Sequence, residues 1–459
     1  MSRLPRPLLC VLGLAISLSP PVLAQQSQQQ ARRGLPARPV VQRLTAPESS
    51  AEVVPAPAAG GIAMQGPAGA SLNLDQASDL AVRNNPLLAQ ARARIDANIG
   101  KAIQAGIWNN PRWDTNNPQV FAGNQSQYNA GFQQEVPVMG KLRLDRAAAT
   151  QDVYQARFAY IRQRFDLLTA VRQQFYRVLA QERRVAVLRE LVEIATRSHH
   201  AAQQREKAGA VAETDVLLLL IELQQARIAL ENAQLILVGA RRALAATMGL
   251  PRLEISDALG DLTANLPEFE EGAMRQFVAT QNAAVREAEL QIVQNRILLQ
   301  RAQVEPYPNI YTGPAVAWGP SSSSNGGSGS QFWYNFQFNI PTWNLNQGGV
   351  RAANANIRDA VASVGVLQND LLRQAAETLA AYRAARDRAR YIGEQILPTA
   401  ERTFRLMQNA YEVGQVDVAP VLQAQKALTQ VNLDYVEALE AAWTNAAALA
   451  GLLQVEIFP

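Results

Sequence analysis

The chain has 459 residues, of which 48% are hydrophobic and 18% charged, so it holds enough material for one large domain or two to three ordinary ones. Its formal charge of +4 arises in residues 1–70, which hold six arginines and two glutamates, while the rest of the chain carries equal numbers of basic and acidic side chains. A neutral body lacks the basic patch that nucleic acid requires, so a nucleic-acid partner is excluded.

Residues 1–24 form a secretory signal peptide by their pattern. Arg3 and Arg6 precede an apolar run, and Val22-Leu23-Ala24 supplies a cleavage site. Cys10, the only cysteine, lies inside the apolar run, so the exported protein is expected to contain no cysteine. A lipoprotein signal would need a small residue before that cysteine, but Leu9 stands there.

Residues 25–70 are rich in Gln, Pro, Ala and Arg without periodicity, which is typical of a disordered leader. No later segment approaches the roughly 20 apolar residues that a membrane helix needs. If the protein crosses a bilayer, we expect it to do so with strands.

One pattern occurs twice after this leader, which predicts a first structural repeat at 71–265 and a second at 266–459. Asn85 corresponds to Asn282 and Pro111 to Pro308 at one constant spacing. Gly209 corresponds to Gly414 at a slightly larger spacing, as expected if the Ser/Gly tract "GPSSSSNGGSGS" is an insertion in the second copy.

Each copy is expected to contain the same elements in the same order. A helix of about 35 residues leads to a β-hairpin, at about 111–137 and about 308–341, followed by a long helix at about 143–205 and about 350–410 and a second helix of about 35 residues. The long helices carry an apolar stripe at spacings of three and four, which buries one seam against a partner helix. At 1.5 Å per residue, one long helix spans on the order of 95 Å and can lie beside two shorter ones placed end to end.

The stretch "SQFWYNFQFNIPTWN" alternates aromatic and amide side chains, as a strand between two environments does. A sheet in water could bury the aromatic side in a core, whereas a membrane barrel would turn it to lipid. No charged residue occurs in 115–134 or 306–350, and a basic side chain facing lipid near the midplane costs about 2–4 kcal/mol. We therefore predict a lipid-facing side made of Phe332, Tyr334, Phe336 and Phe338, with Trp318, Trp333 and Trp343 near the membrane interfaces.

Four strands per chain cannot close a barrel, and open strand edges cannot lie in lipid. Two chains would give an eight-stranded barrel, and side chains fill the interior of a barrel of that size. Three chains would give a twelve-stranded barrel, which leaves a lumen. The expected fold class is therefore mainly α with a membrane β-barrel: a homotrimeric 12-stranded barrel continued by a long α-helical barrel.

The ordered set of motifs resembles the TolC-type outer membrane efflux protein family over residues 72–455. The resemblance rests on the duplicated layout, on "LAVRNNPLLAQAR", and on the paired "AGAVAETDVL" and "VGQVDVAPVLQAQ". It implies a channel in the outer membrane that extends into the periplasm and serves as the passive exit of a tripartite pump for drugs or metal cations. The implied partners are a periplasmic membrane-fusion adaptor and an inner-membrane pump. "QQEVPVMGKLRLDRAAA" is similar to the branch linked to resistance-nodulation-division pumps.

The resemblance also implies where the functional residues lie. The helix turns form the periplasmic tips for adaptor docking, and the two glycines suit a turn that needs positive φ. Some family members place aspartates at the pore constriction, but proline and glutamine stand at those positions here, which puts a carboxylate gate in doubt. The nearest acids have an alternative interpretation as N-caps or first-turn residues. The tip residues are Gly209, Val211, Gly414 and Val416; the possible constriction residues are Asp215, Asp417, Pro420 and Gln423.

Residues for catalysis or metal binding are not evident. His199 and His200 are adjacent, so they do not share a helix face, and no nucleophile–base arrangement is recognisable. We expect no enzyme activity, metal site or cofactor. The alternatives to an efflux channel are an outer membrane duct for type I protein secretion and a structural periplasmic coiled-coil stalk, of which the stalk would not need duplicated charge-free strands.

Overall fold

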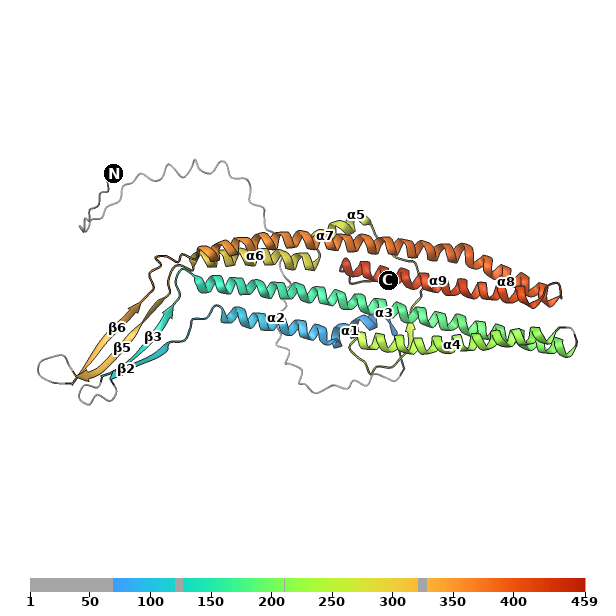
Figure 1. Ribbon diagram of the computed structural model, residues 1–459, viewed down its shortest axis with the longest axis horizontal. Coiled ribbons are helices and arrows are strands. Elements are labelled where there is room, and N and C mark those ends of the chain that lie inside the picture. Colours follow the sequence, from blue (N-terminus) through green and yellow to red (C-terminus); the bar gives the residue numbers. More distant parts are fainter. Residues whose placement is uncertain (1–68, 120–126, 210, 321–327, 459) are drawn as a thin grey trace, which may run out of the picture. The chain divides into compact units, whose positions relative to one another are not determined.

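The computed structural model describes residues 69–119, 127–209, 211–320 and 328–458 (Figure 1). The chain divides into Met1–Ala63, which lies outside the described residues, and Met64–Pro459. The predicted signal peptide and nearly all of the predicted leader therefore lie outside the described part. Among the helices described, none combines the length and apolarity that a membrane span requires.

The same order of elements occurs twice, which confirms the mainly helical, two-repeat fold. The first copy consists of α1 (Leu74–Asn84), α2 (Pro86–Gln104), β2 (Arg112–Gln119), β3 (Gln127–Val136), α3 (Lys141–Lys207) and α4 (Glu213–Thr247). The second consists of α5 (Glu271–Thr280), α6 (Ala283–Val304), β5 (Ile310–Pro320), β6 (Ser328–Gln337), α7 (Gln347–Tyr391), the π-helix η2 (Ile392–Ile396), α8 (Leu397–Glu412) and α9 (Val418–Leu452).

Three details differ from the sequence prediction. The leading helix of each copy is two helices, because the chain breaks at Asn85 before Pro86 and again at Asn282. The long helix of the second copy is interrupted by η2. In addition, β1 (Ala70–Asn73) and β4 (Ile255–Leu259) pair as a small parallel sheet that the sequence pattern did not reveal.

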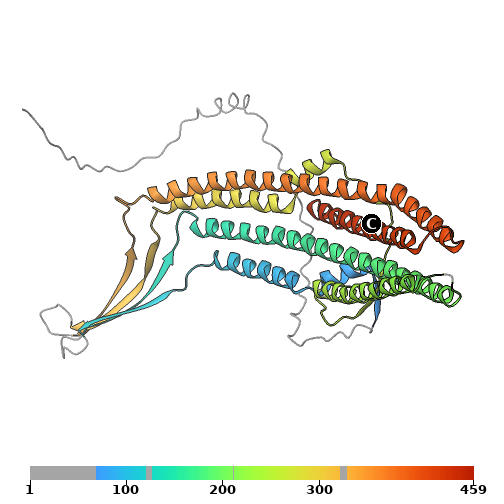
Figure 2. The ribbon, with the colours of Figure 1, turned by 45° about the vertical axis from the view of Figure 1, so that its right-hand side comes forward.

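Helix α3 is the centre of the helical part. It contacts α2 and α6 along its first half and α4 and α9 along its second half, as both views show (Figures 1 and 2). Helix α7 contacts α6 and α9, and α8 contacts α9. The helices thus form two rows, α2–α3–α6–α7 near the strands and α4–α3–α9–α8 near the helix turns, and α3 lies beside two shorter helices as predicted.

Aromatic packing fills the region where α3 and α9 meet. Trp443 is fully buried, stacks on Tyr176 with ring centroids 4.4 Å apart, and donates its indole N–H to the Leu262 carbonyl at 2.9 Å. Phe458 packs edge-on against both rings. Arg172 is buried beside this cluster, donates to the Val455 carbonyl at 3.0 Å and lies over the Phe458 ring. The segment after α9 is thereby held against α3.

The larger sheet is antiparallel in the order β2–β3–β5–β6. Residues that pair across neighbouring strands share a face, so the register assigns each side chain to one of two faces. The aromatic face holds Phe332, Tyr334 and Phe336 with their partners Val316, Pro314 and Thr312. The opposite, polar face holds Gln331, Asn335 and Gln337, and it also holds every charged residue of the four strands as described: Arg112, Asp114 and Glu135.

Candidate functional site

Two helix turns carry the predicted tip residues. Gly209 follows α3 with φ +72° and Gly414 follows α8 with φ +75°, which confirms the predicted positive φ at both positions. A Cβ added to either glycine would meet no atom within 4 Å, so the backbone conformation and not space requires glycine here. Gly209 donates its N–H to the Glu206 carbonyl at 2.8 Å, and Gly414 donates to Tyr411 at 3.1 Å.

The valines two residues on are half-buried in the turns. Val416 packs against the cluster of Phe404, Val421 and Ala424 between α8 and α9, whereas Val211 follows the α3 turn directly before α4. Val416 therefore helps to hold α8 and α9 together, and only part of each valine side chain is presented to solvent.

The acids and their neighbours lie at the starts of α4 and α9. Asp215 lies in the first turn of α4, and Asp417 is the N-cap residue of α9 without a side-chain capping bond. These are the positions of the alternative interpretation, where a carboxylate interacts favourably with the helix dipole. Pro420 and Gln423 are exposed on α9. Among the described residues, no ion pair or side-chain hydrogen bond joins Asp215 or Asp417 to another group, so neither acid is committed to a partner in this chain.

Arg205 joins the two tips, a contact that the sequence did not predict. Its guanidinium donates to the carbonyls of Tyr411 at 3.2 Å and Glu412 at 2.7 Å, and it lies 5.0 Å from the centroid of the Tyr411 ring. A basic residue in a last helical turn ordinarily neutralises its own helix's carbonyls. Here it binds the end of α8, so the turn after α3 and the turn after α8 lie at one level.

A groove of about 980 Å³ runs along α3, α8 and α9 next to this contact. Apolar side chains such as Ile194, Phe404 and Val421 line it together with charged residues, among them Arg197 and Arg405. Gln425 is buried, and its Nε2 has no hydrogen-bond partner within the described part of the chain. The groove therefore combines apolar surface with one buried amide donor, Nε2 of Gln425, that has no hydrogen-bond partner among the described residues.

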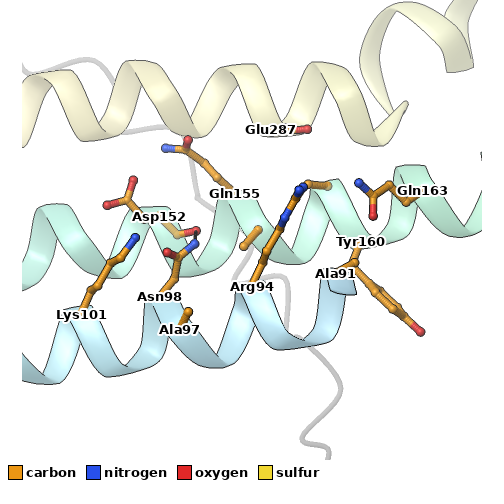
Figure 3. Close-up of a pocket in the computed structure, with 12 residues that line it drawn as sticks. Ala91, Arg94, Ala97, Asn98, Lys101, Asp152, Gln155, Tyr160, Gln163 and Glu287 are labelled. Carbon is orange, nitrogen blue, oxygen red and sulfur yellow. Dashed lines mark hydrogen bonds between the residues drawn. The ribbon is translucent and has the colours of Figure 1, made fainter. Parts of the chain in front are cut away.

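Polar side chains also fill a pocket of about 490 Å³ between α2, α3 and α6 (Figure 3). Gln294 donates to Asp152 at 2.6 Å and accepts from Gln155 at 2.9 Å, and Asn98 donates to the Asp152 carbonyl at 3.3 Å. Burial raises the pKa of Glu287 at its edge, an effect that Arg162 partly offsets. Most of these groups bond one another, so we interpret the pocket as a polar seam between helices, although the buried Oε1 of Gln163 has no hydrogen-bond partner among the described residues.

Charged residues join the two copies where the helices approach the sheet. Arg301 pairs with Asp145 at 2.8 Å and with Glu305, and buried Lys141 donates to the Glu305 carbonyl at 3.3 Å. The hydrogen bond from Arg301 is the main reason that the pKa of Glu305 lies below its ordinary value. Nearby, Glu135 accepts from Asn109 at 2.7 Å and Asn309 at 2.6 Å.

Metal-binding chemistry is not visible in the described residues, where no group of three His, Cys, Asp or Glu side chains could hold an ion. His199 lies near Gln203 of the same helix at 3.4 Å, and its neighbour His200 is exposed.

A duplicated helical body that carries a sheet with one aromatic and one polar face defines a class of membrane channel. The family model for outer membrane efflux proteins matches residues 77–250 and 275–454, one stretch in each copy. The chain belongs to the outer membrane efflux protein family, which confirms the resemblance read from its sequence and places the protein in the outer membrane.

Known proteins agree with this assignment. The cobalt-zinc-cadmium resistance protein CzcC of Cupriavidus metallidurans is 26% identical over 390 residues, covering 83% of this chain and 90% of CzcC. Solved structures share the fold at lower identity. The CusC structure matches with a TM-score of 0.70 and 15% identity over 85% of this chain and 95% of CusC. The Campylobacter jejuni CmeC outer membrane channel matches with a TM-score of 0.67 and 15% identity over 83% of this chain and 85% of CmeC.

Proposed function

We propose that this outer membrane efflux protein is the passive exit duct of a tripartite efflux system. In this proposal three copies form a 12-stranded barrel in the outer membrane and an α-helical barrel through the periplasm. A membrane-fusion adaptor docks at the tips, and an inner-membrane pump supplies the energy. The observation that carries the proposal is the division of the sheet into two faces and two unpaired edges.

The edges support assembly from identical copies. Strands β2 and β6 lie at opposite edges of the four-stranded sheet, and each has one side without a described partner strand. The helix rows run from the first copy to the second in the same order as the strands. Helices α2 and α4 of the first copy lie at one edge, and α7 and α8 of the second copy lie at the other. A head-to-tail contact that places β6 beside the next chain's β2 satisfies strands and helices together, and such a contact closes into a ring.

The faces support a membrane position for the strands. Phe332 is 80% exposed, and Tyr334, Phe336 and Phe338 are also exposed. These rings suit acyl chains. The polar face, which holds the charges, would then line a water-filled lumen. A lumen lined by amides contacts many solutes weakly, as expected of a duct that does not select its cargo.

The tips support the docking assignment. In the proposal Gly209, Val211, Gly414 and Val416 present the turns to the adaptor, and the groove along α3, α8 and α9 adds apolar surface beside them. Asp215, Asp417, Pro420 and Gln423 would lie at the pore constriction. Because Pro420 and Gln423 carry no charge, the two aspartates are the members of this set that could give the constriction a negative potential.

Metal cations are the favoured cargo within this proposal. The curated relative is named for cobalt, zinc and cadmium resistance, and its similarity covers most of both chains. A protein-secretion duct would share the fold, but no feature of the described residues favours it over metal export.

A deletion strain tests the function and the docking site together. We expect the strain to become sensitive to zinc, cobalt or cadmium salts, and the full-length gene to restore resistance. A variant lacking residues 209–215 should still form trimers but should restore no resistance, because the adaptor has lost one turn. A matched variant lacking residues 321–327 of the Ser/Gly tract should restore resistance. Full resistance with the tip deletion would refute the docking assignment, and unchanged sensitivity to metals, dyes and detergents in the deletion strain would refute efflux.

A further inference from the structure

Helices α3 and α8 form the two walls of the groove next to the tips, and α9, which packs on both, forms its floor (Figure 1). Ile194 of α3 packs there against Phe404 of α8 and Val421 of α9, so the bottom of the groove is apolar. Its volume of about 980 Å³ is that of a large ligand pocket. All of these residues belong to one chain, so what the groove holds depends neither on the trimer nor on the cargo.

The groove is lined by two residues whose buried polar atoms have no partner. Gln425 of α9 is 2% exposed, and its Nε2 forms no hydrogen bond within the described residues. The hydroxyl of Tyr411 is likewise buried, and no described residue bonds it. Buried polar groups in native proteins are nearly always hydrogen-bonded, so two such atoms in one groove indicate a place for a ligand. A change of side-chain rotamer turns the Gln425 amide toward that ligand.

Two arginines stand at one level on the opposite walls. Arg205 binds the carbonyls of Tyr411 and Glu412, which fixes the position of α3 along α8. Counted back from this contact at 1.5 Å per residue, Arg197 of α3 lies about 12 Å away and Arg405 of α8 about 10 Å away. The two guanidinium groups therefore face the groove from both sides at nearly the same height.

These arginines and the buried amide are available to one ligand group. Gln425 lies at the level of the arginines, because the turn of α9 that carries it packs against Phe404. Arg197 forms no ion pair with another described residue. Arg405 pairs with Glu401 of its own helix at 3.6 Å, and an exposed pair of this kind contributes little to stability. Three donors can thus converge on one acceptor, which favours an anionic group.

Beyond this level the groove has the length of an acyl chain. From Arg197 back to Arg183 the α3 wall runs about 21 Å, compared with about 15 Å for half the hydrocarbon core of a bilayer. The acids Glu190 and Glu412 lie about 10 Å from the arginines on either side, so with Glu401 counted the arginine level keeps one net positive charge. The apolar lining of this stretch includes Leu191, Leu397 and Leu428.

We propose that this groove is a binding site for a single-chain anionic amphiphile, such as a fatty acid. The carboxylate lies between Arg197 and Arg405 and accepts a hydrogen bond from the Gln425 amide, and the acyl chain follows the apolar stretch away from the tips. Such a ligand satisfies a buried donor and covers apolar surface at the same time. The site goes beyond the proposed function, which assigns the turns themselves to the adaptor.

Cysteine protection in the full chain, embedded in phospholipid nanodiscs, tests the site, because the only native cysteine lies in the expected signal peptide. Ser198→Cys places a thiol in the groove, and His200→Cys is the matched control, exposed on the same helix but outside the groove. Dodecanoate is the probe, with its free concentration set by dialysis. At about ten times its dissociation constant it should slow maleimide labelling of Ser198→Cys about tenfold and leave that of His200→Cys unchanged.

Variants of the donors test the chemistry of the site in the Ser198→Cys background. Gln425→Leu and Arg197→Gln should each raise the dodecanoate concentration for half-protection about tenfold, because each removes one hydrogen bond to a charged group. Arg189→Gln, which changes an exposed arginine of α3 outside the groove, should leave that concentration unchanged.

Four results would overturn the proposal. Absence of protection, or equal protection of both cysteines, would show that dodecanoate does not bind in the groove. Equal protection by dodecyltrimethylammonium would show that the arginines do not select an anion. Protection by purified adaptor but not by dodecanoate would assign the groove to the adaptor. None of these results bears on the exit duct, which the resistance of the deletion strain tests separately.

Discussion

At the scale of single residues, one asparagine in each copy joins two helices end to end. The Oδ1 of Asn85 accepts the Leu87 N–H at 2.8 Å, and its Nδ2 donates to the carbonyl of Thr247, the last residue of α4, at 2.8 Å. Asn282 repeats this arrangement with Ala284 at 2.9 Å and Leu452, the last residue of α9, at 3.0 Å. The start of α2 and the end of α4, and equally α6 and α9, are therefore fixed to each other beside the long helix.

Loss of this asparagine should weaken the stacking measurably. We expect Asn85→Ala to lower the free energy of unfolding by about 2 kcal/mol, because it removes an N-cap and leaves the partly buried Thr247 carbonyl without the Asn85 donor. Asn85→Ser should cost about half as much, since serine caps a helix well but is too short to reach Thr247. The measurement is thermal unfolding in detergent followed by circular dichroism. Asn354→Ala is the control: that exposed side chain bonds only the Val350 carbonyl of its own helix, so a shift as large as that of Asn85→Ala would contradict the role given to the buried asparagine.

At the scale of elements, the sequence predicted the helices and strands whose apolar residues recur periodically. It did not predict the features that depend on a single contact. The length of α3 follows from its apolar spacing, and the tip glycines follow from the need for positive φ. The break at Asn85 has a local cause in Pro86, but the apolar pattern continues across it because α1 and α2 both pack on α3. A π-turn such as η2 leaves no periodic signature. Its Gly393 lies close to Tyr435 of α9, whose ring would be 3.1 Å from an added Cβ.

The contact between the tips was not predictable, because nothing near Arg205 in the chain indicates which carbonyls it binds. Tyr411 and Glu412 are about 200 positions away, and the residues that mark the turns are the glycines. The candidate tip residues were thus inferred from the family resemblance, with the need for positive φ supporting the two glycines, whereas the residue that sets the two tips at one level was found only from the structure.

The hairpin tips should move more freely without this contact. We expect Arg205→Gln to increase amide hydrogen exchange in residues 405–416 by on the order of tenfold, because two charge-assisted hydrogen bonds contribute about 1.5–3 kcal/mol to holding the segment closed. Trimer formation should be unchanged. Arg197→Gln is the matched variant, since Arg197 is exposed on the same helix and forms no ion pair with another described residue. Equal exchange in both variants would show that Arg205 does not hold the tips together.

At the scale of the whole molecule, strands and helix rows impose the same order on an assembly. The sheet runs β2–β3–β5–β6, and the rows run α2–α3–α6–α7 and α4–α3–α9–α8. In the sheet and in both rows, an element of the first copy lies at one edge and an element of the second copy lies at the other. A single head-to-tail arrangement of chains can therefore pair the edges of the sheet and of both helix rows. The internal duplication thereby gives a three-chain ring six similar repeats, which suits a closed tube better than any arrangement in which the chains alternate in direction.

Neighbouring residues on β6 test which face of the sheet meets lipid. Phe332→Arg would place a charge on the aromatic face, where it should cost about 2–4 kcal/mol in a bilayer and sharply reduce the amount of assembled trimer in the outer membrane. Gln331→Arg changes the adjacent residue, whose partner Ala317 lies on the polar face, and should assemble at close to the normal level because its charge enters water. For both variants, the amount of heat-resistant trimer on gels of outer membrane fractions measures assembly. If Gln331→Arg proved the more damaging change, the aromatic side chains would face the interior of the assembly and the strands could not form a water-filled duct.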